Sequence, residues 1–74
     1  MSTTKYEISI ASVPDRDYVV AEIWVEDNLF AEIRREDTGT FIEVYPHPTG
    51  QPWSLECDRL SSILSEANAR LNNS

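Results

Sequence analysis

The residues of this chain that could carry chemistry are one cysteine, one histidine and several closely spaced carboxylates. Cys57 could act as a nucleophile if His47 served as its base and Asp58 oriented the histidine. Cys57 also alternates with Trp53 and Leu55, however, which is more typical of a small buried hydrophobic residue. We therefore expect Cys57 to pack in the interior and not to react.

The sequence contains no set of residues with the types and spacing needed to bind a metal ion or a cofactor. A structural zinc site needs four clustered ligands, and a single Cys with a single His does not supply them. Asp15-Arg16-Asp17 lacks the glycine and the ligand spacing of a calcium loop. With two glycines in the chain, there is no glycine-rich loop for a phosphate. The sequence thus predicts no catalytic residue, no metal site, no cofactor and no enzymatic activity.

Glu22, Glu32 and Glu43 could also supply the pair of carboxylates that a glycosidase uses. The segments around them predict an open sheet, and a chain of 74 residues offers little concavity in which a carboxyl pKa could be raised. Binding is a better use for them than acid–base catalysis.

The elements that position these residues are predominantly strands. Tyr6, Ile8 and Ile10 alternate with polar residues, and three later segments are rich in β-branched and aromatic residues. Strands are predicted over residues 6–10, 18–25, 29–35 and 40–45. Glu26-Asp27-Asn28 suits a three-residue hairpin loop with Asn28 in the left-handed conformation, and residues 14–17 and 36–39 suit the other turns.

The last third of the chain predicts a loop and a helix. Prolines and a glycine make residues 46–52 irregular, and residues 53–57 either add a short fifth strand or begin the helix. Asp58 is a favourable N-cap, and one apolar stripe follows it, formed by Leu60, Ile63, Leu64, Ala67 and Leu71. We predict an α+β fold in a single domain, residues 1–74. An antiparallel meander of four strands, or five, covers about residues 4–57, and one C-terminal helix over about 58–72 packs on one face.

The hydrophobic pattern selects the strand register. Pairing Ile23 with Ala31 and Ile33 with Ile42 builds one aliphatic face, whereas a slip of one residue would place glutamates in it. The helix stripe belongs on this face. We expect one shared core formed by Ile23, Ile33, Val44, Leu60 and Leu64.

The same register predicts the composition of the opposite face. Glu22, Glu32 and Glu43 form a row across three strands, at a cost of a few tenths to about 1 kcal/mol for each like-charged pair. Trp24 is expected beside Phe30, and Phe30 beside Tyr45. Either these aromatic residues pack on one another or under the loop 46–53, or the face docks a partner. The predicted partner-binding residues are Glu22, Trp24, Phe30, Glu32, Glu43 and Tyr45.

The charge balance restricts the kind of partner. Thirteen acidic residues against six basic ones give a net charge of −7, which disfavours binding to nucleic acid or to an anionic membrane. A basic protein partner fits this charge, and solubility alone is the other explanation. No apolar run reaches the ~20 residues of a membrane span, and the N-terminus lacks the apolar region of a signal peptide. We expect a cytoplasmic protein.

Three stretches carry a resemblance, namely VAEIWVEDNLFAEI, IEVYPHPTGQPW and LSSILSEANARL. They resemble a loosely defined group of small acidic bacterial proteins, mostly uncharacterised, some of which have immunity-protein-like labels in polymorphic toxin systems. The resemblance covers roughly residues 6–71 and transfers no catalytic residue. It implies a toxin as partner, often a basic nuclease, that an acidic surface occludes.

Two functions follow as expectations. The first is a non-enzymatic acidic binding protein that masks a basic protein partner, in the form of a toxin immunity protein. The alternative is a small structural or regulatory subunit that self-associates, as a homodimer, through an edge strand or through the aromatic face. A small hydrolase is the third and least supported reading.

Overall fold

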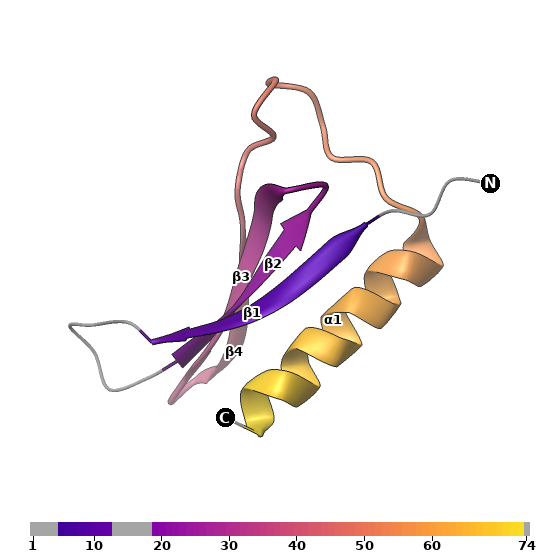
Figure 1. The fold of residues 1–74 in the computed structure, drawn as a ribbon. Coiled ribbons are helices and arrows are strands. Elements are labelled where there is room, and N and C mark those ends of the chain that lie inside the picture. The colour runs from indigo at the N-terminus through magenta and orange to yellow at the C-terminus, as the bar shows by residue number, and fades with distance from the viewer. Residues whose placement is uncertain (1–4, 13–18, 74) are drawn as a thin grey trace.

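The computed structural model of the chain describes residues 5–12 and 19–73, which form one antiparallel sheet and one helix (Figure 1). The strands β1 (Tyr6–Ser12), β2 (Val19–Val25), β3 (Asn28–Glu36) and β4 (Gly39–Val44) lie side by side in chain order. The helix α1 spans Cys57–Asn72. The predicted α+β meander with one C-terminal helix is therefore confirmed. The turn expected at residues 14–17 and the strand start at Tyr18 lie outside the described residues.

The core lies between α1 and the inner face of the sheet. Ile63, Ala67 and Leu71 of the predicted helix stripe are buried, while Leu60 and Leu64 are half-buried at its margins. The largest fully buried side chains are Ile23 of β2 and Ile63 of α1. Other buried members of this cluster are Ile8, Ala21, Val25, Phe30, Ala31 and Ile33.

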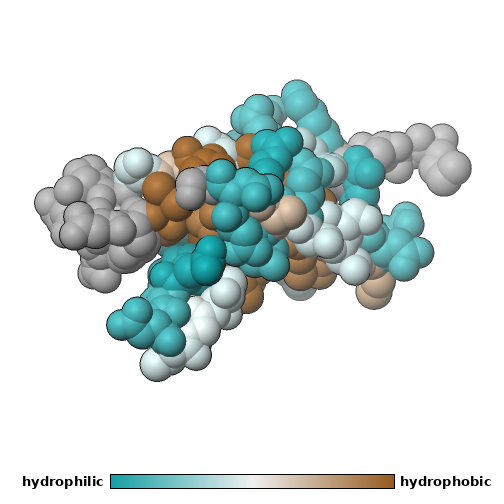
Figure 2. All heavy atoms as spheres, turned by 90° about the horizontal axis from the view of Figure 1, so that it is seen from below, coloured by the Kyte–Doolittle hydropathy of each residue, from teal (hydrophilic) through white to brown (hydrophobic). Residues whose placement is uncertain are grey.

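Strand β4 lies beyond the reach of the helix. The backbone of α1 approaches β1, β2 and β3 but not β4. A helix about 10 Å wide covers about two strands spaced 4.8 Å apart, so one helix cannot cover this sheet. Ile42 and Val44 are consequently 46% and 55% exposed, and the prediction that Val44 belongs to the core is wrong. Figure 2 shows hydrophobic residues reaching the surface among hydrophilic ones when the molecule is viewed from below.

The β2–β3 turn differs from the predicted three-residue loop. Val25 pairs with Asn28, so only Glu26 and Asp27 lie in the turn, and both have positive φ values, 49° and 69°. Two consecutive positive φ angles are those of a type I′ turn, whose twist matches that of the two strands. A bulge then shifts the register between Ile23 and Trp24, and Phe30 is the extra residue.

The connection from β4 to α1 contains no fifth strand. Residues 53–56 are irregular and Cys57 begins the helix. Glu56 is the N-cap and makes no side-chain capping bond, so Asp58 is not the cap; it lies in the first turn, where its charge favours the helix dipole. Cys57 is exposed, which makes the expectation of a buried cysteine wrong.

Candidate functional site

The outer face of the sheet carries the predicted row of glutamates. Glu22 pairs with Glu32, and Glu32 pairs with Glu43, so the three carboxylates lie across β2, β3 and β4. The Tyr45 amide donates to the Phe30 carbonyl, and because hydrogen bonding alternates along an antiparallel pair, Glu32 bonds toward β4. Glu22 and Glu32 therefore form a non-hydrogen-bonded pair, the type in which facing side chains are closest.

Among the described residues, the ion pairs of this row are confined to one end. Arg34 contacts Glu43 at 3.2 Å and Glu36 at 2.7 Å, and the Glu36 hydrogen bond raises the pKa of Arg34. Within the described part of the chain, Glu22 and Glu32 make no ion pair. The charge of Glu32 also contributes to the raised pKa of Arg34, but without an ion pair, so Glu22 and Glu32 remain adjacent like charges.

Neutral donors hold the two central glutamates in place. The indole N–H of Trp24 donates to Glu22 at 3.4 Å, and the Tyr45 hydroxyl donates to Glu32 at 3.3 Å. Burial raises the pKa of Tyr45, and the nearby charges of Glu32 and Glu43 raise it further. The row is therefore flanked by aromatic side chains that keep both carboxylates oriented without cancelling their charge.

Phe30 does not lie on this face, and the expectation that it stands beside Trp24 is wrong. Because the bulge shifts the side-chain alternation by one residue, Phe30 and Ala31 both face the core. Phe30 is 5% exposed, and Leu29 takes the place opposite Trp24.

The loop 46–53 reaches Phe30 through Trp53, but on the core side of the sheet, and so not as the interpretation in which this loop covers the aromatic residues of the outer face. The ring of Trp53 packs edge-on against Phe30 with centroids 5.1 Å apart, and its N–H donates to the Tyr45 carbonyl at 2.8 Å. The other five predicted site residues lie on the outer face: Glu22, Trp24, Glu32, Glu43 and Tyr45. Glu43 is exposed and the other four are half-buried.

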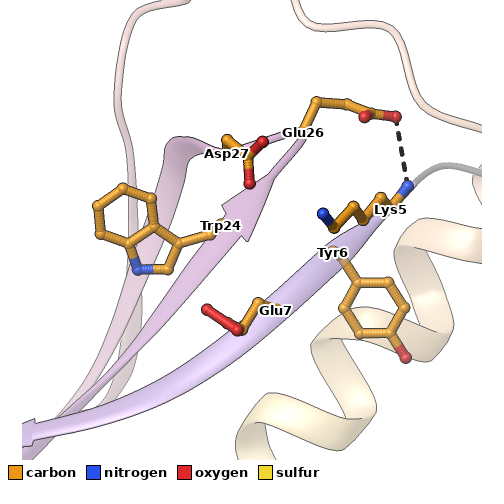
Figure 3. Close-up of a pocket in the computed structure, with 6 residues that line it drawn as sticks. All are labelled: Lys5, Tyr6, Glu7, Trp24, Glu26 and Asp27. Atoms are coloured by element: carbon orange, nitrogen blue, oxygen red, sulfur yellow. Dashed lines mark hydrogen bonds between the residues drawn. The ribbon is translucent and has the colours of Figure 1, made fainter.

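A hollow of about 380 Å³ borders Trp24 (Figure 3). Its lining includes Trp24, Glu7, Glu26 and Asp27, and the backbone N–H of Lys5 donates to the Glu26 carboxylate at 3.3 Å. Lys5 also lines the hollow and supplies one positive charge. The three carboxylates outnumber it, so the hollow keeps a negative charge beside the indole, and both features favour a cation. Sequence reasoning missed these three acidic residues, although the alternation of Glu7 with Tyr6 and Ile8 already indicated its face.

The described ranges contain no arrangement of residues suited to metal binding, and their one histidine has a structural role. Residues 5–12 and 19–73 contain no group of three His, Cys, Asp or Glu side chains able to hold a metal ion. His47 packs against Trp53 with ring centroids 4.5 Å apart, and its Nδ1 lies 2.9 Å from the Thr49 hydroxyl and 3.2 Å from the Thr49 amide. This histidine serves to shape the loop.

Comparisons of the chain with protein-family models, with curated proteins and with solved structures find no match. Within the described ranges, no helix has the length and apolarity needed to cross a membrane.

Proposed function

We propose that this protein is a non-enzymatic binding protein whose acidic outer face docks on, and masks, a basic protein partner. The observation that carries the proposal is the row of Glu22, Glu32 and Glu43, which crosses the outer face of the sheet beside Trp24. The helix packs on the opposite face, so docking here requires no rearrangement of the core.

The physical argument starts from the energy of the free protein. Facing like charges in a sheet destabilise it by a few tenths to about 1 kcal/mol per pair. A cationic side chain placed between Glu22 and Glu32 removes that repulsion in the complex, and it also steers the partner's approach. The repulsion between Glu22 and Glu32 thus lowers the stability of the free protein. A partner's cation bound at the same place would remove that repulsion.

Trp24 supplies the apolar part of the same surface. It is half-buried, already oriented by Glu22, and borders the hollow that Glu7, Glu26 and Asp27 line. An arginine or lysine of the partner would lie against the indole with its charge among these carboxylates, which outnumber the one cationic residue of the lining, Lys5. Tryptophan is a frequent interface anchor because it buries a large area with few rotatable bonds.

The particular form that we favour is a toxin immunity protein. The resemblance of three segments to small acidic proteins with such labels supports this form, and so does the acidity of the face. A basic nuclease has a cationic surface for its substrate, and an acidic protein docked there would occlude it.

An octa-arginine peptide is a suitable probe for the surface. We expect Trp24→Ala to weaken its binding about tenfold or more at unchanged net charge, since a central anchor contributes about 2 kcal/mol. Glu32→Lys should weaken it similarly, whereas Asp37→Lys, which changes the net charge equally from an exposed turn, should have a small effect. Equal losses for the two lysine variants, together with normal binding by Trp24→Ala, would show that the probe senses only net charge. The dissociation constants of the wild type and the variants for octa-arginine are measured by calorimetric titration at two salt concentrations.

A further inference from the structure

The two edges of the sheet differ in how they are protected. At the β1 edge, the guanidinium of Arg70 donates to the Ile8 carbonyl at 3.1 Å, and the Tyr6 hydroxyl donates to Glu66 at 2.8 Å. The Arg59 guanidinium lies 4.9 Å from the centre of the Tyr6 ring. Side chains of α1 thus occupy this edge, and another strand cannot pair along it without displacing them.

Within residues 5–12 and 19–73, nothing comparable covers the β4 edge. The strand contains no lysine, proline or bulge, and its one charged residue, Glu43, lies on the outer face beside Arg34. Phe41, Ile42 and Val44 are 41%, 46% and 55% exposed. An exposed apolar edge of this kind is a template for pairing with another strand.

The backbone groups at the β4 edge can be assigned from the hairpin. The Tyr45 amide donates to the Phe30 carbonyl at 2.9 Å. Because every second residue of an antiparallel strand bonds to the same neighbour, Tyr45, Glu43 and Phe41 make the hydrogen bonds to β3. The intervening residues, Thr40, Ile42 and Val44, direct their N–H and C=O groups to the free edge. These three residues are also the ones on the aliphatic face.

We propose that β4 pairs antiparallel with β4 of a second copy of this chain, with Ile42 of one copy opposite Ile42 of the other. Thr40 then lies opposite Val44 in both directions, and each of these pairs can exchange both of its hydrogen bonds. On the outer face, Glu43 lies opposite Phe41 of the second copy and not opposite Glu43. A pairing centred on Glu43 would oppose two like charges, and one centred on Phe41 would leave Val44 unpaired.

The uncharged residues around β4 allow a second copy of this acidic chain to bind there. Beside β4 and α1 lies a groove of about 380 Å³, lined by Ile33, Thr40, Phe41, Ile42, Leu64, Ser65 and Asn68. None of these side chains is charged, so a second chain of net charge −7 meets no acidic residue there. The acidic row points to the other face, and the dimer would carry two such rows on one continuous sheet.

This inference does not rest on the proposed function, because the edge and the outer face are different surfaces. Sedimentation velocity of the whole chain from about 1 to 500 µM tests it through mass action. We expect the mass to rise with concentration from 8.4 kDa toward 16.8 kDa, twice the chain mass. Ile42→Lys, which places two ammonium groups together on the two-fold axis, should keep the protein monomeric. Ile10→Lys is the matched control on the β1 edge, where Ile10 is 38% exposed, and it should dimerise normally.

Hydrogen exchange measured at both ends of that range gives a second readout that does not depend on a variant. The amides of Thr40, Ile42 and Val44 should exchange more slowly at high concentration, while the Phe41 and Glu43 amides, already bonded to β3, should change little. Added salt should favour the dimer by screening the repulsion of two acidic chains, whereas it should weaken octa-arginine binding. A wild-type protein that stays monomeric throughout, or a dimer that tolerates Ile42→Lys with unprotected β4 amides, would overturn the inference.

Discussion

The two faces of this sheet are built from alternate residues of the same strands, yet they have different properties. On the inner face, Ile23 and Ile33 are buried beneath α1. On the outer face, one residue away along the same strands, Glu22 and Glu32 oppose each other with no described cation between them. The inner face is arranged for stability, and the outer face accepts a cost in stability.

The inner face contains the residues that determine the fold, and the outer face contains those to which we assign binding. The helix and the aliphatic residues fix the register, and the register then forces the glutamates into a row. A chain under selection for stability alone could place a lysine at one of the central positions without disturbing the inner face. That it has glutamate at all three positions is the reason for assigning a role to the outer face.

The largest expected effect is on the inner face. Ile63→Ala removes a fully buried side chain at the centre of the helix–sheet contact, and it should lower the free energy of unfolding by about 2–5 kcal/mol. Val44→Ala, at a position 55% exposed, should cost well below 1 kcal/mol. Urea denaturation compares the two variants. Similar losses would mean that α1 does not restrict the core to β1, β2 and β3.

A smaller effect of opposite sign is expected on the outer face. Glu32→Lys replaces the central carboxylate of the row and brings a positive charge between Glu22 and Glu43. It should raise the free energy of unfolding by up to about 1 kcal/mol at low salt, and by less when salt screens the charges. Asp37→Lys is the control, because it changes the net charge equally at a turn. A gain of the same size in both variants would reflect only the reduced net charge.

The pH dependence provides the smallest expected effect. The folded-state pKa of Tyr45 is raised by burial and by Glu32 and Glu43, and that of Tyr6 is raised chiefly by its hydrogen bond to Glu66. A raised pKa stabilises the fold below the ordinary value of 10.0, and this contribution is lost as the pH rises through the higher folded value. Glu32→Gln should therefore lower the Tyr45 pKa, as followed by phenolate absorbance. An unchanged value would indicate that the glutamate row does not act on Tyr45.

The sequence was sufficient to predict the register and the glutamate row, because only one alignment of the strands keeps Ile23, Ala31, Ile33 and Ile42 on the same face. The helix stripe was equally predictable from its spacing. The exposure of β4 followed from dimensions, since a single helix is narrower than four strands, but the apolar pattern of Ile42 and Val44 suggested a fully covered sheet.

The position of Phe30 could not be predicted from the pattern. Glu26-Asp27-Asn28 contains no glycine to signal a two-residue type I′ turn, and a two-residue turn followed by a bulge restores the same register as a three-residue loop. The two arrangements differ in where Leu29 and Phe30 point. The decisive contact, with Trp53, comes from a loop without periodicity. The hollow at Trp24 depends on the same turn and was missed for the same reason.

The central claim is that the outer face sacrifices stability for binding, and one pair of measurements on Glu32→Lys tests it. The free energy of unfolding and the dissociation constant for octa-arginine are measured at the same low salt concentration, with Asp37→Lys alongside. We predict that Glu32→Lys is more stable than the wild type and binds the peptide about tenfold or more weakly, while Asp37→Lys changes little in either quantity. A Glu32→Lys protein that is more stable and binds as tightly as Asp37→Lys would contradict the claim and reduce the outer face to an ordinary sheet surface.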